Sequence, residues 1–455
     1  MGLSPFSATR AGWCRSSVDR GTDDGWGWVA GFRLERCELG VATAATQVEG
    51  GDIDTNWHRW AAAGRITDGS TPARAADHWN RVAEDTALLT ELGVRHYRMG
   101  LEWARVEPEP GRYDPDAIAH YRDELTRLRD AGIRPLVTLH HFSEPGWFVD
   151  AGGWLVQAAL PVFLRYVRTV VGELGDLVTD WITINEPSVY AVHAYLWGVW
   201  PPGERSYRRT IAALEVLCAA HLAAYPVIHE LQPEARVGVA HHLRVFAPRN
   251  PRNPAHRLAA ALTRRLFQDA ELELTSTGRS LFPVRAPRGV RPGRYADFQA
   301  INYYSRSTVA GVGNGVASGV DVNDLGWEVY PAGLTELAAS VHARYPGPIW
   351  ITENGTADAN DAFRSRYLYE HLAAIAASDL PIERYYHWCF TDNFEWAEGE
   401  AARFGLVHLD YDTQQRTVKE SGRFYADIAA NGGVTDAAYD RWVAGRRYPR
   451  NGGRP

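Results

Sequence analysis

The 455-residue sequence contains a single lysine, Lys419, and arginine carries the rest of the positive charge. This scarcity argues against several chemistries, because Schiff-base aldolases, pyridoxal enzymes and Walker phosphate loops each need a lysine amine at the active site. The setting Arg416-Thr-Val-Lys419-Glu420 matches none of their motifs. A lyase or aldolase is therefore the least favoured of the functions that we consider.

Cysteine is scarce as well, and its spacing excludes two kinds of site. The four cysteines lie far apart and form no Cys-x-x-Cys pair, which argues against zinc ribbons and redox dithiols. The doublets His140-His141 and His241-His242 lack the carboxylate spacing of a zinc motif, and we interpret them as structural or sugar-binding histidines. No metal or cofactor is expected.

Long apolar runs and runs of like charge are also missing. The first thirty residues lack the apolar stretch of about 7 to 15 residues that a signal peptide needs. No segment reaches the roughly eighteen uninterrupted apolar residues of a transmembrane helix. The 48 basic and 55 acidic residues are spread along the chain, with a net charge of −7. We therefore expect a cytoplasmic protein that has neither a nucleic-acid nor a membrane partner.

What the sequence does contain is an alternation of short apolar runs with longer stretches of helical period, typical of parallel βαβ units. Segments 82–92 and 163–174 carry apolar residues every three or four positions and are predicted to be helices. Eight runs are predicted to be strands: 39–43, 94–99, 134–139, 181–185, 236–240, 298–303, 349–352 and 385–390.

Eight such repeats favour a closed barrel. A doubly wound sheet is disfavoured because no glycine-rich phosphate turn follows the first strand, and no low-complexity linker divides the chain. We predict an α/β protein with a single (β/α)8 TIM barrel over residues 32–430. A poorly ordered extension, residues 1–31, is expected before it, and a C-terminal tail, residues 431–455, after it.

Polar residues gather directly after these predicted strands. In such barrels the carboxyl ends of the strands and the loops that follow form the active face, so the pattern predicts a functional site there. The residues are Gln47, Glu49, Arg98, Glu102, His140, His141, Asn185, Glu186, Asn302, Tyr303, Tyr304, Glu353, Asn354, Trp388, Glu395 and Trp396.

Two of these residues, Glu186 and Glu353, suit glycoside hydrolysis, which needs one protonated carboxylic acid at the leaving oxygen and one carboxylate near the anomeric carbon. Most acidic residues face solvent or close a surface ion pair. Here each glutamate ends an apolar strand, where burial is costly and calls for a reason. A separation of about 5 to 5.5 Å would indicate retention of configuration, and about 6.5 to 9.5 Å inversion.

The segments Thr183-Ile-Asn185-Glu186-Pro187 and Ile351-Thr-Glu353-Asn-Gly355 resemble the two signature motifs of family 1 glycoside hydrolases, the β-glucosidase and β-galactosidase family. Further matches run in the family's order between residues 32 and 428. They lie at 44–50, 77–81, 97–98, 138–142, 302–304, 392–399 and 404–410.

This resemblance implies a role for each matching residue. Glu186 would be the general acid and base, and Glu353 the nucleophile of a double displacement. Arg98 and Tyr304 would contact Glu353 and favour its charged form, while Glu186 stays neutral before the first step. The sugar would be bound by Gln47, His140, Asn185, Trp388, Glu395 and Trp396.

The resemblance also narrows the substrate, a small β-glycoside or short oligosaccharide. Glu395 would repel a phosphate dianion, so an unphosphorylated sugar is expected, and Glu186 stands where plant thioglucosidases have glutamine, which favours O-glycosides. A β-glucosidase that tolerates β-galactosides and β-fucosides, with transglycosylation as a variant, is the leading hypothesis. A catalytically silent sugar-binding barrel is the alternative, which the retention of both glutamates disfavours. Glu400, where the family usually has an aromatic residue, predicts an unusual aglycone preference.

Overall fold

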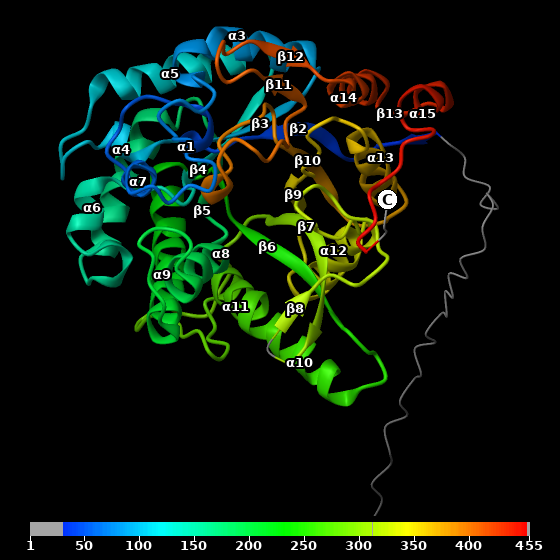
Figure 1. Ribbon diagram of the computed structural model, residues 1–455. Helices are drawn as coiled ribbons and strands as arrows, with labels where there is room; N and C mark the ends of the chain where they lie inside the picture. Colours follow the sequence, from blue (N-terminus) through cyan, green and yellow to red (C-terminus); the bar gives the residue numbers. More distant parts are fainter. Residues whose placement is uncertain (1–30, 312, 453–455) are drawn as a thin grey trace, which may run out of the picture.

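The computed structural model describes residues 31–311 and 313–452, and it confirms the predicted barrel. The strands pair in the order β6-β5-β4-β3-β2-β10-β9-β7, and β6 pairs with β7 to close the ring (Figure 1). All these pairings are parallel. The strands are β2 (Glu38–Ala42), β3 (His96–Gly100), β4 (Arg134–His140), β5 (Asp180–Asn185), β6 (Arg236–Pro248), β7 (Gln299–Ala310), β9 (Ile349–Asn354) and β10 (Ile382–Trp388).

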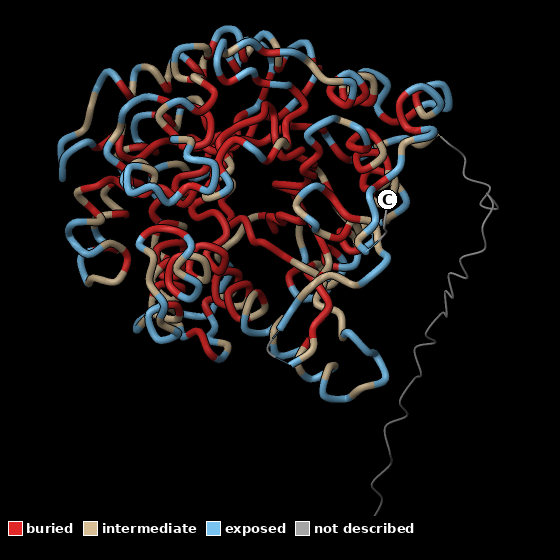
Figure 2. The backbone as a smooth tube through the Cα atoms, in the orientation of Figure 1, coloured by how far each residue is buried: buried red, intermediate tan, exposed pale blue. Residues whose placement is uncertain are grey.

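The strands read as nearly continuous apolar runs because both of their faces are covered, one by the barrel interior and one by helices. Every residue of β5 and β9 is buried. Figure 2 shows the buried backbone concentrated in the barrel and the exposed backbone in the outer ring. The main outer helices are α3 (His78–Glu91), α5 (Pro115–Asp130), α7 (Ala159–Leu174), α9 (Tyr207–Leu231), α12 (Ala332–Arg344), α13 (Arg364–Ala376) and α14 (Glu420–Asn431).

The predicted helices 82–92 and 163–174 form the larger parts of α3 and α7. In α7, Phe163, Val167, Val170 and Leu174 recur at helical spacing and are buried against the barrel. Among the described residues one helix, α9, is long and apolar enough to cross a membrane by length and composition. More than half of the most apolar segment of α9 is buried inside the protein, and the helix packs against α7 and β5, as an outer helix of a barrel does.

The segment predicted as a C-terminal tail, residues 431–455, contains a strand and a helix in its described part, up to residue 452. β1 (Phe32–Arg33) pairs antiparallel with β13 (Gly433–Val434), which ties this segment to the start of the barrel. α15 (Asp436–Trp442) then buries Trp442, whose indole donates to Asp427 on α14 at 3.0 Å. Strands of two residues are too short to leave a periodic pattern, so they could not be predicted from the sequence. Of the predicted N-terminal extension, residues 1–30 lie outside the described part of the chain.

Two strands run further than predicted. β6 and β7 stay paired from Ala240↔Ala300 to Pro248↔Val309, well past the predicted ends of both runs. β8 (Gly313–Gly315) adds to the far end of β7, and α10 (Pro254–Arg264) follows β6, so that this arm projects from the barrel (Figure 1). The arm forms one wall above the carboxyl ends of the strands.

Candidate active site

The carboxyl ends of the strands open into a cavity of about 760 Å³, a size typical of small-ligand sites. The structure brings most of the predicted site residues together there. Those that line the cavity are Asn185, Glu186, Tyr304, Glu353, Trp388, Glu395 and Trp396. Gln47 and Arg98 are fully buried and contact these residues from behind.

Glu353, at the end of β9, has the two predicted partners. Arg98 donates from Nη1 to its Oε1, and the hydroxyl of Tyr304 donates to its Oε2, both at 2.5 Å. The other terminal nitrogen of Arg98 donates to Oδ1 of Asn185 at 2.7 Å. One guanidinium therefore links the ends of two strands. The carboxylate of Glu353 has a strong donor at each of its two oxygens.

Glu186 follows β5 at a sharp change of direction. Its φ of +43° lies in the left-handed region, and the chain turns there into α8 (Pro187–Ala191). A non-glycine residue in this region is strained, and such residues cluster at functional sites. The amide of Asn302 donates to Oε1 of Glu186 at 2.8 Å, and Nδ1 of His242 lies 3.3 Å from the same oxygen.

The protonation of the two carboxyls differs from the sequence-based expectation. Burial raises the pKa of Glu353 to about 7. The charge of Arg98 opposes this rise, and the charge of Glu186 adds to it. Burial would also raise the pKa of Glu186, but His242, followed by the amide of Asn302, holds it below its usual value. The expected order of the two pKa values is thus reversed. The reason is His242, whose position beside Glu186 no spacing in the sequence indicates.

The placement of His140 in the cavity is wrong. His140, the last residue of β4, points away from the cavity and its Nε2 lies 2.8 Å from Glu144. The next residue, His141, lines the cavity, with its Nε2 2.9 Å from Nδ2 of Asn185. Burial, then the charge of Arg98, holds the pKa of His141 well below its usual value. The neutral ring accepts from Asn185 at Nε2, so Nδ1 carries the proton.

Gln47 and Glu395, which were both predicted to bind the sugar, contact each other. Nε2 of Gln47 donates to Oε2 of Glu395 at 3.0 Å and to the carbonyl of Phe394 at 2.8 Å. Burial raises the pKa of Glu395 to about 8, although Gln47 opposes it, and the charges of Glu353 and Glu186 add to the effect. A carboxyl that is protonated near neutral pH both donates and accepts, as adjacent sugar hydroxyls require.

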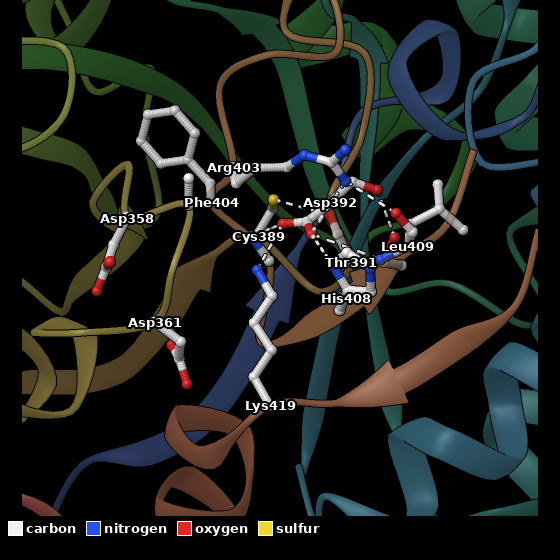
Figure 3. Close-up of polar contacts among 12 residues, drawn as sticks. Asp358, Asp361, Cys389, Thr391, Asp392, Arg403, Phe404, His408, Leu409 and Lys419 are labelled. Carbon is white, nitrogen blue, oxygen red and sulfur yellow. Dashed lines mark hydrogen bonds and ion pairs between the residues drawn. The ribbon is translucent and has the colours of Figure 1, made fainter. Parts of the chain in front are cut away.

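The loop that carries Glu395 is anchored by the single lysine. Nζ of Lys419 donates to Oδ1 of Asp392 at 2.8 Å, and the backbone N–H of Gly405 donates to the same oxygen at 3.0 Å (Figure 3). Asp392 is fully buried, and burial alone would raise its pKa, but the contact with His408, followed by Lys419 and the charge of Arg364, keeps it below the usual range. Lys419 is absent from the cavity lining, so its role is to position this loop.

Comparison with known proteins agrees with this geometry. The model of glycosyl hydrolase family 1 matches residues 35–284 and 294–434. The chain belongs to this family. β-Glucosidase A of Thermotoga maritima is 31% identical over 436 residues, which cover 87% of this chain and 97% of that protein. The protein is therefore a glycoside hydrolase, as the sequence motifs predicted.

Solved structures match this family 1 hydrolase over nearly their whole length. A β-glycosidase from Pyrococcus horikoshii superposes with a TM-score of 0.83 and 32% identity, covering 90% of this chain and 98% of that one. The β-glucosidase from Thermotoga maritima in complex with glucoimidazole gives a TM-score of 0.81 and 31% identity, covering 89% and 100%. The fold is thus that of the family.

The cavity of this family 1 hydrolase has a wider aromatic lining than the two predicted tryptophans. The additional lining aromatics, from helices, loops and the arm, are Trp60, Phe142, His193, Trp197, Trp200, His242, Phe246, Phe267, Trp327 and Phe404. Most of these follow no predicted strand, so the sequence offered only their residue type as a signal. Glu400 does not line the cavity and pairs with Arg74 instead, which removes it as the source of an aglycone preference.

Proposed function

We propose that this family 1 hydrolase is a retaining β-glycosidase that acts mainly as a β-glucosidase on unphosphorylated β-O-glycosides. The observation that carries the proposal is that Glu186 and Glu353 line one cavity and share a hydrogen-bonded chain. This chain runs from Glu353 through Arg98 to Asn185, and from Asn302 to both Asn185 and Glu186. Two carboxyls that share a cavity and differ in pKa are the requirement of glycoside hydrolysis.

In the first step an oxygen of Glu353 bonds to the anomeric carbon as the bond from that carbon to the leaving oxygen breaks. Glu186 gives its proton to the leaving oxygen, and a covalent glycosyl-enzyme results. In the second step Glu186 takes a proton from water, the water oxygen bonds to the anomeric carbon, and Glu353 leaves as a carboxylate. Two inversions at the same carbon give net retention.

These two reaction steps need the proton that the two carboxyls share to be on Glu186 when the substrate is bound. A sugar in the cavity places the leaving oxygen beside Glu186, whereas Glu353 keeps its donors from Arg98 and Tyr304. Both of those donors favour the ionised form of Glu353. We therefore propose that substrate binding moves the proton of the pair from Glu353 to Glu186. Because the two carboxyls interact, their pH profile belongs to the pair.

Sugar recognition follows from the polar atoms at the cavity floor. We assign it to Gln47, His141, Asn185, Trp388, Glu395 and Trp396, with His141 in place of His140. The protonated Nδ1 of His141 and Oε1 of Gln47 are buried and have no hydrogen-bond partner among the described residues, so both remain available to hydroxyls. The indoles of Trp388 and Trp396 offer apolar faces to the C–H groups of a pyranose.

The test compares hydrolysis of nitrophenyl β-glucoside by the wild type, Glu353→Ala and Glu186→Ala, with the exposed Glu91→Ala as a matched control. We expect both site variants to lose activity. Azide should restore turnover of Glu353→Ala with formation of the α-glycosyl azide, and of Glu186→Ala with formation of the β-glycosyl azide. Failure to obtain any azide product from Glu353→Ala would refute the nucleophile assignment. Equal, negligible rates for wild type and variants would favour a sugar-binding barrel without catalysis.

Sugar preference and the fate of the glycosyl-enzyme intermediate are also tested with aryl glycosides. Initial rates on matched aryl β-glucoside, β-galactoside and β-fucoside should be highest for the glucoside. Addition of an alcohol acceptor should divert part of the intermediate to transglycosylation products, since the second step uses any hydroxyl that reaches the anomeric carbon. A galactoside rate above the glucoside rate would contradict the proposed preference.

A further inference from the structure

One wall of the cavity is built by the outer part of β6. His242, Arg244 and Phe246 line the cavity, whereas Leu243 and Val245 do not. This alternation is the period of a strand, in which every second side chain points to the same side. The three side chains therefore lead outward in order: the imidazole beside Glu186, then the guanidinium, then the phenyl ring.

Arg244 is half-buried, and it is unusual among the arginines of the described chain that are not exposed, because no carboxylate lies within ion-pair distance of it. Its only side-chain hydrogen bond within the described part of the chain runs from Nη1 to the hydroxyl of Ser307 at 3.3 Å. Its Nε is buried and has no partner among the described residues. By contrast, Arg98 is paired with Glu353, and Arg306 on β7 with Glu328. A guanidinium withdrawn from water without an anion is costly, which indicates that the anion arrives with a ligand.

The surroundings of Arg244 are aromatic. Phe267 packs edge-on against Phe246 at a centroid distance of 5.7 Å and against His242 at 6.0 Å. Trp327 lies across the same cavity, edge-on to Tyr304 at 5.8 Å. A flat apolar group fits between such walls, and a guanidinium at their edge matches the two oxygens of a carboxylate in a forked geometry.

We propose that Arg244 binds a carboxylate carried by an aromatic aglycone, so that the enzyme prefers β-glucosides of aromatic carboxylic acids. This deepens the proposed function and rests on it, because it takes Glu186 as the group that protonates the leaving oxygen. The aglycone then leaves on the side of Glu186 and His242. Arg244 stands one alternate position further along β6, so that its Cα lies about 7 Å from that of His242. An aglycone of one benzene ring, with the glycosidic oxygen at one end and the carboxylate at the other, has a comparable length.

An anion on the sugar itself would lie elsewhere. Glu353 and Glu395, on the sugar side of the cavity, would face it. Arg65, the other arginine in the lining, is exposed and therefore hydrated, so it has no need of a buried anion. The aglycone side is the part of the cavity where a half-buried positive charge without an ion-pair partner and apolar walls occur together.

The test uses para-carboxyphenyl β-glucoside and its neutral methyl ester. For each enzyme variant we measure the ratio of kcat/KM for the acid to kcat/KM for the ester. Comparison of this ratio between variants cancels the difference in leaving-group reactivity. Arg244→Met should lower the ratio at least tenfold, and Arg244→Lys by less, because it keeps the charge and loses the fork. Arg65→Met, which removes one positive charge from the same cavity, should change the ratio less than twofold.

A change of less than twofold in Arg244→Met, or a larger change in Arg65→Met, would overturn the proposal. A measurement on the wild type guards against a variant that does not fold: para-hydroxybenzoate should inhibit at a concentration at least tenfold lower than its methyl ester. Equal inhibition, or weaker inhibition by the acid, would also overturn it. Failure of the proposed function is distinguishable, since the wild type would then hydrolyse neither glucoside.

Discussion

Replacement of the single lysine, Lys419→Met, tests how the sugar-binding loop is held. Methionine keeps the length of the side chain but removes its charge. Lys419 is 7% exposed, Asp392 is fully buried, and their atoms lie 2.8 Å apart (Figure 3). The substitution therefore leaves a buried carboxylate without its nearest cation. Breaking a buried ion pair in this way costs about 3 to 5 kcal/mol of unfolding free energy.

The structure places the expected loss near the lower end of that range. Asp392 keeps the backbone N–H of Gly405 at 3.0 Å, and Arg403 remains at 3.4 Å. We expect Lys419→Met to lower the free energy of unfolding by about 3 kcal/mol, measured by equilibrium urea denaturation with two spectroscopic probes. Because the loop also carries Glu395 and Trp396, KM for aryl glucosides should rise in the folded variant.

Two controls decide the interpretation. Arg168→Met breaks an ion pair with Glu230 whose side chains are 49% and 66% exposed, and it should cost less than about 1 kcal/mol. The double variant Lys419→Met with Asp392→Asn should recover part of the loss, because the uncompensated charge is gone. A loss for Lys419→Met no larger than that for Arg168→Met would refute the reasoning, as would a double variant less stable than Lys419→Met.

Three further predictions concern histidines. His141→Ala should lower kcat/KM for aryl glucosides about tenfold, which corresponds to the loss of one hydrogen bond. The decrease should be larger than that for His140→Ala. A larger decrease for His140→Ala would restore the sequence-based assignment. His242→Gln should move the alkaline limb of kcat/KM to higher pH, because a group that holds down the pKa of Glu186 is removed. Although burial opposes them, flanking carboxylates raise the pKa of His78 to about 10. Its contribution to stability is full below about pH 6.5 and is lost as pH rises through about 10, so urea denaturation of His78→Gln should show a flatter pH dependence than wild type.

The sequence predicted the features that repeat or that match long motifs. All eight barrel strands were found because each is an apolar run bounded by turn residues, and both glutamates because each ends such a run. The boundaries were less accurate where the pattern changed. Beyond residue 240 the run His241-His242-Leu243-Arg244-Val245-Phe246 mixes polar and apolar residues, which hid the extension of β6. Its period of two was the available signal.

The errors in the site arise from geometry that residue spacing does not determine. His140 and His141 are adjacent at the end of a strand, where successive side chains point to opposite faces, so a choice between them is a choice of face. The sequence indicates both histidines as site residues, and sugar binding was predicted for His140 instead of His141. The order of the two pKa values depends on how near His242 lies to Glu186, and this distance follows from the closure of β6 onto β5 and β7.

The two halves of the cavity depend on different parts of the fold, which makes them separable by mutation. The proposed nucleophile, Glu353, is held by Arg98 from β3 and by Tyr304 from β7, within the closed barrel. The aglycone side is formed by the part of β6 that extends beyond the ring, and His242 is the one residue there that touches a catalytic carboxyl. Substitutions at Arg244 and Phe246 should therefore change which leaving group is preferred, while substitutions at His242 should change the pH profile with every substrate.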